Sequence, residues 1–214
     1  MDTRSKLRGM VQDLAYCLRR RDLATTGRWL GETLRTLFYQ RIEYTVFARS
    51  LEQPLPSFEA CLPIVCRLAT ADDLSYLRDS VLPSEFERLS RRLAHGRICL
   101  LALYQDALAA YMWASEEVDL EIDNLELRLE PGDVYLDDAY TLPAYRRQGI
   151  QMGLHIRQLR SWQERRCKRT VAIVAIDNLP SQGLFNKLGY QEVDRLSFRR
   201  VLFRREYRYH DGRF

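Results

Sequence analysis

The segment from Tyr135 to Tyr190 constrains the fold most, because it runs through strand, loop, helix, strand and helix in one stretch of chain. Its run VAIVAI, residues 171–176, is continuously apolar, as expected of a strand buried on both faces of a sheet. A chain of 214 residues with 46% hydrophobic and 29% charged residues can bury such a sheet in one domain plus an appendage. Disordered, collagen-like and coiled-coil chains are excluded.

The rest of the chain predicts further strands and helices. Apolar residues three and four apart predict two helices within 1–40, and alternation predicts a strand over 41–51. A linker with three prolines follows. The later expected helices are 71–77, 84–93, 147–166 and 180–188, and the expected strands are 64–68, 97–104, 107–114 and 134–142, with an extended arginine-rich stretch over 190–209. We therefore expect a helical and strand extension over 1–60 and a second domain over 61–214.

Charge and cysteine content limit the partners and the compartment. Lys plus Arg number 33 and Asp plus Glu number 29, and a net charge of +4 is too small to indicate nucleic-acid binding. The five cysteines are scattered without a CxxC pair, so we expect reduced thiols and no metal site. The first residues lack an apolar stretch of signal-peptide or membrane-spanning length, so we expect a cytoplasmic protein.

A candidate anion site follows the strand YLDDAYTL, where Pro143 leads into the loop YRRQGIQMG at the start of a helix. Backbone amides converge at a helix N-terminus and the helix dipole adds partial positive charge, so a pyrophosphate is the natural guest. Arg146 and Arg147 add full charges, and Gly149 permits close approach of a ligand to the backbone. Taken alone, the pattern also fits a loop that binds nothing.

Two motifs, in the right order and spacing, resemble those of the GNAT superfamily, the acyl-CoA-dependent N-acetyltransferases. The first is Pro-x-Tyr followed by Arg/Gln-x-x-Gly-x-Gly/Ala, and it stands here as residues 143–151, PAYRRQGIQ. The second is an Asn, a small residue, an aromatic residue and Lys-x-Gly-Tyr/Phe, and it stands as Asn178, Ser181, Phe185 and 187–190. The resemblance covers about residues 62–198.

The resemblance implies an α/β (α+β) fold with a mixed, mostly antiparallel sheet, in which a central parallel pair, 134–142 and 171–176, splays apart. It implies acetyl-CoA or another acyl-CoA as donor, with pantetheine in the splay, where two amides would match free backbone groups. The residues it implies for cofactor binding are Ala139, Tyr140, Thr141, Leu142, Arg146, Arg147, Gln148, Gly149, Gln151, Met152, Asn178, Ser181 and Phe185.

Two positions depart from the family pattern. Gln151 stands where Gly or Ala is usual, and we expect binding to survive with its side chain directed away from the phosphates. Phe185 stands where Tyr is common, and phenylalanine has no proton to give to a departing thiolate. Either a water or another residue supplies that proton, or the thiolate, derived from a thiol of pKa about 8.5, leaves unaided.

Asp137 and Asp138 are the candidate bases for an amine acceptor. Successive strand residues face opposite sides, so we expect only one of them to point at the acceptor. Matching to family members with an acid on this strand favours Asp137, and adjacent carboxylates raise each other's pKa. The alternative is that both are solvated or paired with arginines after Tyr190. Tyr140 is a wall residue that could orient the acceptor.

Two charged stretches bear on the partners. Residues 116–138 carry ten acids and one arginine, and if they line the acceptor mouth the acceptor is cationic, such as a polyamine, an amino sugar or a lysine side chain. Otherwise they form a solvated hairpin balanced by Arg195, Arg199, Arg200, Arg204, Arg205 and Arg208. Residues 1–50 carry ten Lys/Arg against five Asp/Glu. They either pack on the domain or meet a membrane surface or an acyl carrier protein. A homodimer through a terminal strand also fits.

These features predict an N-acetyltransferase that moves an acetyl group from acetyl-CoA to a primary amine by direct attack in a ternary complex, since no cysteine is placed as a covalent nucleophile. Two alternatives stay open. A longer acyl chain, from CoA or a carrier protein, would need an apolar tunnel that the N-terminal extension could cover. A non-catalytic acyl-CoA-binding module is the other alternative, supported by Gln151 and Phe185.

Overall fold

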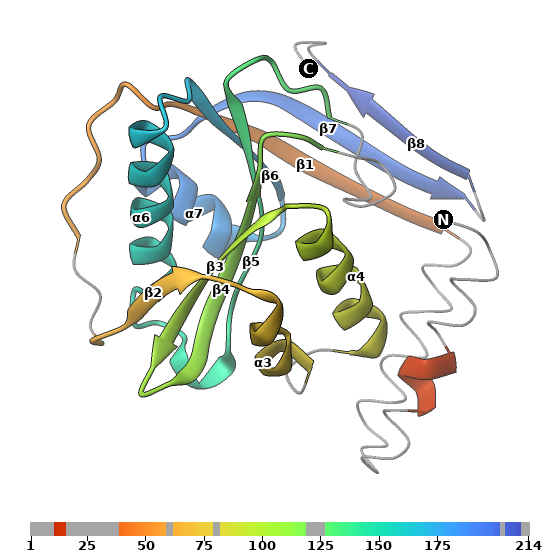
Figure 1. Cartoon of the computed structure of the whole chain (residues 1–214). Helices are drawn as coiled ribbons and strands as arrows, with labels where there is room; N and C mark the ends of the chain where they lie inside the picture. The colour runs from red at the N-terminus through yellow and green to blue at the C-terminus, as the bar shows by residue number, and fades with distance from the viewer. Residues whose placement is uncertain are drawn as a thin grey trace.

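The computed structural model describes residues 11–15, 39–58, 62–78, 82–118, 127–201 and 204–210. They build one eight-stranded sheet in the order β2-β3-β4-β5-β6-β1-β7-β8 (Figure 1). Its strands are β1 (Tyr39–Ser50), β2 (Val65–Leu68), β3 (Ile98–Tyr104), β4 (Ala107–Ser115), β5 (Asp133–Thr141), β6 (Arg169–Ala175), β7 (Gln191–Val201) and β8 (Arg204–Tyr209). Among the strands that the structure describes, β5 and β6 are the one pair that is parallel. The expected mixed, mostly antiparallel sheet is confirmed.

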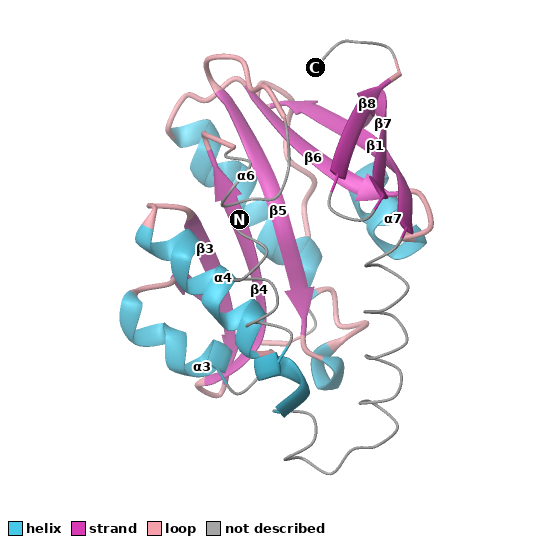
Figure 2. Ribbon diagram, turned by 90° about the vertical axis from the view of Figure 1, so that its right-hand side faces the viewer, coloured by secondary structure: helices cyan, strands magenta, loops and turns pink. Residues whose placement is uncertain are grey.

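Helices cover both faces of this sheet (Figure 2). One face carries η1 (Ala71–Asp73), α3 (Leu74–Arg78) and α4 (Pro83–Ala94), and the other carries α6 (Ile150–Glu164) and α7 (Leu179–Lys187), with η2 (Pro143–Tyr145) between β5 and α6. Leu89 of α4 packs with Trp113 in one apolar cluster, and Leu154 of α6 packs with Met112 and Leu136 in another. Among the described residues, no helix is long and apolar enough to cross a membrane.

β1 is an inner strand, although it comes first along the chain. It lies between β6 and β7 and pairs antiparallel with both, so that Val46 faces Ile173 on one side and Asp194 on the other. Val46 and Phe47 are buried. The residues before 61 therefore contribute a central strand to the sheet that the later residues build.

The expected elements differ from the structure in three places. The helix expected from residue 147 begins at Ile150, because Arg147 and Gly149 are left-handed, with φ of 64° and 73°. The extended stretch over 190–209 is two strands, β7 and β8, paired as a hairpin. Most of the region 1–40, where two helices are expected, lies outside the described residues; 11–15 are helical, and 39–40 already belong to β1. The other predicted strands and helices are confirmed within a few residues.

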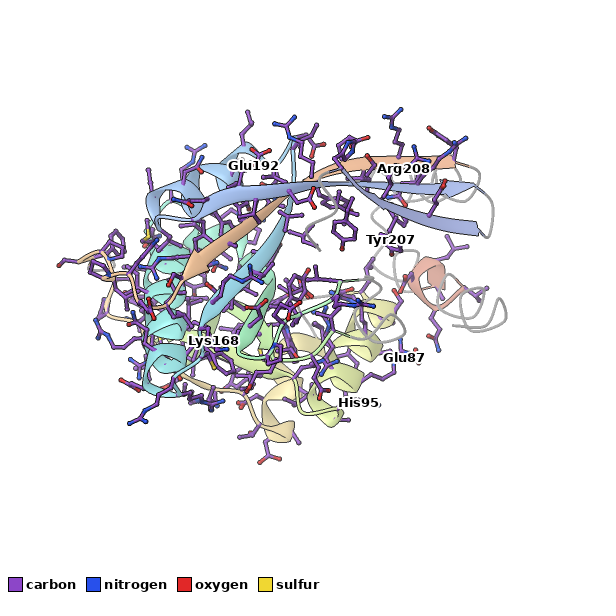
Figure 3. The ribbon with its side chains drawn as sticks, turned by 90° about the horizontal axis from the view of Figure 1, so that it is seen from above. Glu87, His95, Lys168, Glu192, Tyr207 and Arg208 are labelled. Atoms are coloured by element: carbon purple, nitrogen blue, oxygen red, sulfur yellow. The ribbon has the colours of Figure 1, made fainter. Side chains whose placement is uncertain are left out.

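The outermost strand, β8, presents different residues to its two sides. Tyr207 packs against an apolar cluster that contains Leu196 and Tyr135, whereas Arg208 is exposed (Figure 3). Arg208 lies 3.8 Å from Glu206, a residue of its own strand. Arg195 of β7 likewise donates to Glu192, at 2.7 Å.

Candidate active site

A cavity opens where β5 and β6 separate. The two strands pair only over Asp133–Leu136 and Arg169–Ala172, and beyond this point a cavity of about 280 Å³ lies between them. Its lining includes Asp137, Asp138, Ala139, His155, Asn178, Ser181 and Phe185. The structure thus brings together the predicted strand residues and the second motif.

A β-bulge in β5 sets the direction of the two candidate bases. Tyr140 pairs with Tyr111 and Asp137 pairs with Trp113, so two residues of β5 stand opposite one residue of β4. Asp138, at the bulge, has φ of 42°. Both carboxylates consequently point toward α4. The prediction that they face opposite sides of the sheet is wrong, because the extra residue interrupts the two-residue alternation of the strand.

Two arginines of α4 hold these carboxylates. Arg92, only 1% exposed, donates to Asp137 and to Asp138, the latter at 3.3 Å. Arg88 donates to Asp138 at 2.6 Å and also to Glu85. The structure therefore does not show the alternative in which Asp137 and Asp138 pair with the arginines after Tyr190. Those arginines start on β7, which two strands separate from β5.

The carboxylates of Asp137 and Asp138 differ in how many of their oxygens already accept a hydrogen bond. Asp137 accepts from Arg92 on Oδ2 and from the hydroxyl of Tyr135 on Oδ1, at 3.4 Å. Asp138 accepts from both arginines on Oδ2, and its Oδ1 has no donor among the described residues. Burial raises the pKa of Asp138, with Arg88 acting against it and the negative charge of Asp137 adding to it. Asp138 is therefore a carboxylate with a raised pKa and with one oxygen that no described donor occupies.

The predicted anion loop forms the first turn of α6. Gly149 is its N-cap, and the amide of Gly153 donates to the Gly149 carbonyl at 3.1 Å. The first-turn amides before Gly153 have no intrahelical acceptor, so they can bind an anion. Arg146 donates to the Thr141 carbonyl at 3.1 Å and to the Tyr140 hydroxyl at 3.3 Å, whereas Arg147 is exposed.

Gln151 points into the protein and not into this loop. Its side-chain amide donates to the Tyr111 carbonyl of β4, at 3.3 Å. Met152, the next residue, packs against the apolar core. The unusual glutamine at position 151 is thus accommodated by the sheet.

At the start of α7, the Asn178 side chain accepts from the Ser181 amide at 3.4 Å.

Phe185 lies in an aromatic cluster at the cavity. Its ring stacks on Phe47 with centroids 5.6 Å apart and meets Tyr190 edge-on at 4.8 Å. The Tyr190 hydroxyl is hydrogen-bonded to Thr170 at 2.8 Å, on a buried site away from the cavity lining. Neither ring therefore replaces the hydroxyl that Phe185 lacks.

His155 is a cavity residue that the sequence motifs do not reveal. It is buried and meets Phe185 edge-on at 5.3 Å. Its Nδ1 lies 2.8 Å from the Gln151 carbonyl, which can only accept, so Nδ1 carries the proton and Nε2 is an acceptor. Burial lowers its pKa to about 4, so the ring is neutral at physiological pH. A histidine within an otherwise apolar helix stripe was the available signal.

Replacing His155 by leucine should flatten the dependence of the free energy of unfolding on pH. His155 takes up a proton near pH 6.5 in the unfolded chain but only near pH 4 in the folded chain. The free energy of unfolding should therefore fall by about 3 kcal/mol as the pH is lowered from 6.5 to 4. Urea unfolding between pH 4 and 7 measures the slope. The exposed His95, replaced by glutamine, is the control and should keep the wild-type slope. Equal slopes in wild type and His155→Leu would contradict the assignment.

Comparison with known proteins agrees with this geometry. The family model described as Acetyltransferase (GNAT) family matches residues 64–190, more than half of the chain. The aminoglycoside N(6')-acetyltransferase type 1 of Acinetobacter haemolyticus is 34% identical over 65 residues, which are 30% of this chain and 44% of that protein. The chain thus spans less than half the length of this relative.

Solved structures share the fold. A GCN5-related N-acetyltransferase from Sphaerobacter thermophilus superposes with a TM-score of 0.56 at 18% identity, over 84% of this chain and 57% of that one. A tandem GNAT protein from the clavulanic acid biosynthesis pathway does so with a TM-score of 0.56 at 16% identity, over 76% and 54%. Together with the matched family model, these findings show that the chain belongs to the acetyltransferase (GNAT) family.

Proposed function

We propose that this protein is an N-acetyltransferase that moves an acetyl group from acetyl-CoA to a primary amine. The observation that carries the proposal is the cavity between β5 and β6, which brings Asp138 together with Asn178 and Ser181 at the start of α7. A basic carboxylate and a polar helix terminus then line one space between two separated strands. This arrangement suits an amide-rich donor and an amine acceptor that meet there.

The residues present fit acetyl-CoA. Among the described residues, β5 forms no pair with β6 beyond Leu136, so the backbone of Ala139 and Thr141 can meet the two pantetheine amides. The first-turn amides of α6 suit a pyrophosphate, and Arg147 is exposed beside them. When bound, acetyl-CoA supplies an activated acetyl carbonyl and the thiolate of a thiol with pKa about 8.5 as leaving group.

Within this proposal Asp138 is the base. Its free Oδ1 takes the proton of the attacking amine, while Arg88 and Arg92 hold Oδ2 in place. The raised pKa of Asp138 favours this role over Asp137, both of whose oxygens are hydrogen-bonded. Tyr140, whose ring lies 5.9 Å from that of Tyr111, forms a wall for the acceptor on the same face.

The charges around Asp138 favour a cationic acceptor. Glu85, Asp137 and Asp138 face Arg88 and Arg92, which leaves one negative charge in excess. The relative from Acinetobacter haemolyticus is named for acetylating an aminoglycoside, which supports an amino sugar or a polyamine. With Phe185 in place of a hydroxyl-bearing residue, the thiolate departs without a proton from that position.

Gly149→Glu should weaken acetyl-CoA binding about 100-fold, because it places an anion among the first-turn amides of α6. A Cβ at Gly149 would also lie 2.5 Å from the Phe58 ring. Gly96→Glu is a matched control, since Gly96 has the same φ of 73° with nothing within 4 Å of a Cβ. Calorimetric titration measures both variants. If both bind acetyl-CoA like the wild type, the donor site lies elsewhere.

The function itself is tested by titration with acetyl-CoA, CoA and a long-chain acyl-CoA, followed by thiol release on a polyamine, an aminoglycoside and a lysine peptide. Acetyl-CoA binding with turnover on a cationic amine supports the proposal. Clear preference for the long acyl chain would replace it with a longer-chain transferase. Binding without turnover on any amine would replace it with a non-catalytic acyl-CoA-binding module.

A further inference from the structure

A second cavity lies at the edge of the sheet, away from the β5–β6 cavity. It has a volume of about 390 Å³ and is lined by residues of β2, β3 and α6. Its lining is Cys66, Arg67, Leu68, Leu100, Arg157, Gln158, Arg160, Ser161 and Glu164, and it shares no residue with the first cavity. A ligand here would therefore not compete directly for the space between β5 and β6.

The helix side of this cavity is polar and cationic. Residues 160 and 161 lie three and four residues after 157, and residue 164 lies four and three residues after them, so these side chains form one stripe along α6. Within the described part of the chain, Arg157 and Arg160 form no ion pair. Two guanidinium groups on one stripe, against the single carboxylate of Glu164, make this wall a binding surface for anions.

Gln158 lines the same cavity, between the two arginines along the helix. The residue is only 3% exposed, although the polar atoms of its side-chain amide are not fully cut off from solvent. A polar group of a ligand in the cavity can therefore exchange hydrogen bonds with this amide in place of water.

The sheet side of the cavity is apolar. Cys66 and Leu68 of β2 pair with Ala102 and Leu100 of β3, so Leu68 and Leu100 share one wall. Leu68 is 52% exposed. Arg67 is turned to Asp73, to which it donates at 2.5 and 2.6 Å, so its charge is already matched. The cavity therefore offers a cationic wall, a buried amide and an apolar wall.

We propose that this cavity is a second binding site, which takes a small organic anion with an apolar body. Arg157 and Arg160 hold its carboxylate or phosphate, Gln158 meets a polar atom next to it, and the body lies on Leu68 and Leu100. Guanidinium groups bind carboxylate and phosphate in the same way. The proposal therefore names a class of ligand, an organic anion with an apolar body.

Phenyl phosphate is a suitable probe, and Cys66 reports where it binds, since its thiol is free and lines the cavity. Saturating phenyl phosphate should slow alkylation of Cys66 by iodoacetamide about fivefold or more in the full chain, because it covers the thiol and is held by charge-assisted bonds. Alkylation of Cys167, followed by mass spectrometry in the same sample, should not change. Benzyl alcohol, the neutral analogue, should protect neither thiol.

Variants test the assigned residues. The double substitution Arg157→Gln with Arg160→Gln should raise the dissociation constant of phenyl phosphate about tenfold or more. Gln158→Leu should raise it as well, by a smaller factor. The double substitution Arg128→Gln with Arg165→Gln removes the same charge outside the cavity and should leave the constant unchanged. Absence of protection at Cys66, protection by benzyl alcohol, or equal constants in the two double variants would each overturn the proposal.

Discussion

Replacing Arg92 by leucine should lower the free energy of unfolding by about 3–5 kcal/mol, the usual cost of removing one partner of a buried charge pair. Arg92 is almost fully buried and donates to both Asp137 and Asp138. Without it, two adjacent carboxylates face each other with Arg88 as their remaining partner on α4. Urea unfolding at pH 7 measures the loss.

Two comparisons separate this effect from simple loss of packing. Adding Asp137→Asn and Asp138→Asn to Arg92→Leu removes the stranded charges and should recover part of the stability. The deficit of Arg92→Leu should also shrink as pH falls, because burial raises the pKa of Asp138 and its protonation removes one of the two charges. A loss below about 1 kcal/mol, or one that acid pH does not change, would show that the pairs contribute little.

Asp138→Asn should lower kcat about 100-fold while leaving the affinity for acetyl-CoA near the wild-type value. Asparagine keeps the shape of the side chain but cannot take a proton from an amine. In the wild type, kcat should fall as pH drops through the raised pKa of Asp138, because only the carboxylate form acts as a base. In the variant this acidic limb should be absent. Steady-state rates on the best amine of the acceptor panel, measured between pH 5 and 9, test both expectations.

Asp137→Asn is the matched variant, since Asp137 lies beside Asp138 and shares Arg92 with it. It should reduce kcat less and keep the acidic limb. If Asp137→Asn shows the larger loss and the flat profile, the base is Asp137. Wild-type rates in both variants would place the base outside this pair.

Local patterns predicted much of the fold. Residues 171–175 of the predicted apolar run lie in β6, and the turn at Gln105 and Asp106, with φ of 49° and 62°, joins β3 and β4 as a tight hairpin. These features depend on residues close together in sequence. The bulge at Asp138 was not predicted, because nothing in the run DVYLDDAYT marks Asp138 as the residue that departs from strand geometry, although aspartate tolerates positive φ. One extra residue reversed the expected direction of a carboxylate.

Only some parts of the candidate site were predicted from the sequence. The motifs pointed to Gly149 and Asn178 as cofactor-binding residues, and in the structure they are the N-caps of α6 and α7. The partners of Asp137 and Asp138 were missed, because Arg88 and Arg92 lie on a helix more than forty residues earlier. A single sequence does not show which of many arginines a distant strand will meet. His155 was missed for the same reason, since its place beside Phe185 depends on the packing of α6 against α7.

The position of β1 in the sheet also determines when the sheet can form during synthesis of the chain. The ribosome makes β1 well before its two neighbours, β6 and β7, because Ser50 at the end of β1 pairs with Arg169 at the start of β6, 119 residues later. Until then β1, whose second half is buried in the folded protein, has neither of its partner strands, and unpaired strands are prone to pair with other chains. Contacts this distant in sequence also slow folding. A nascent chain of this protein must therefore shelter β1 until β6 and β7 have been made.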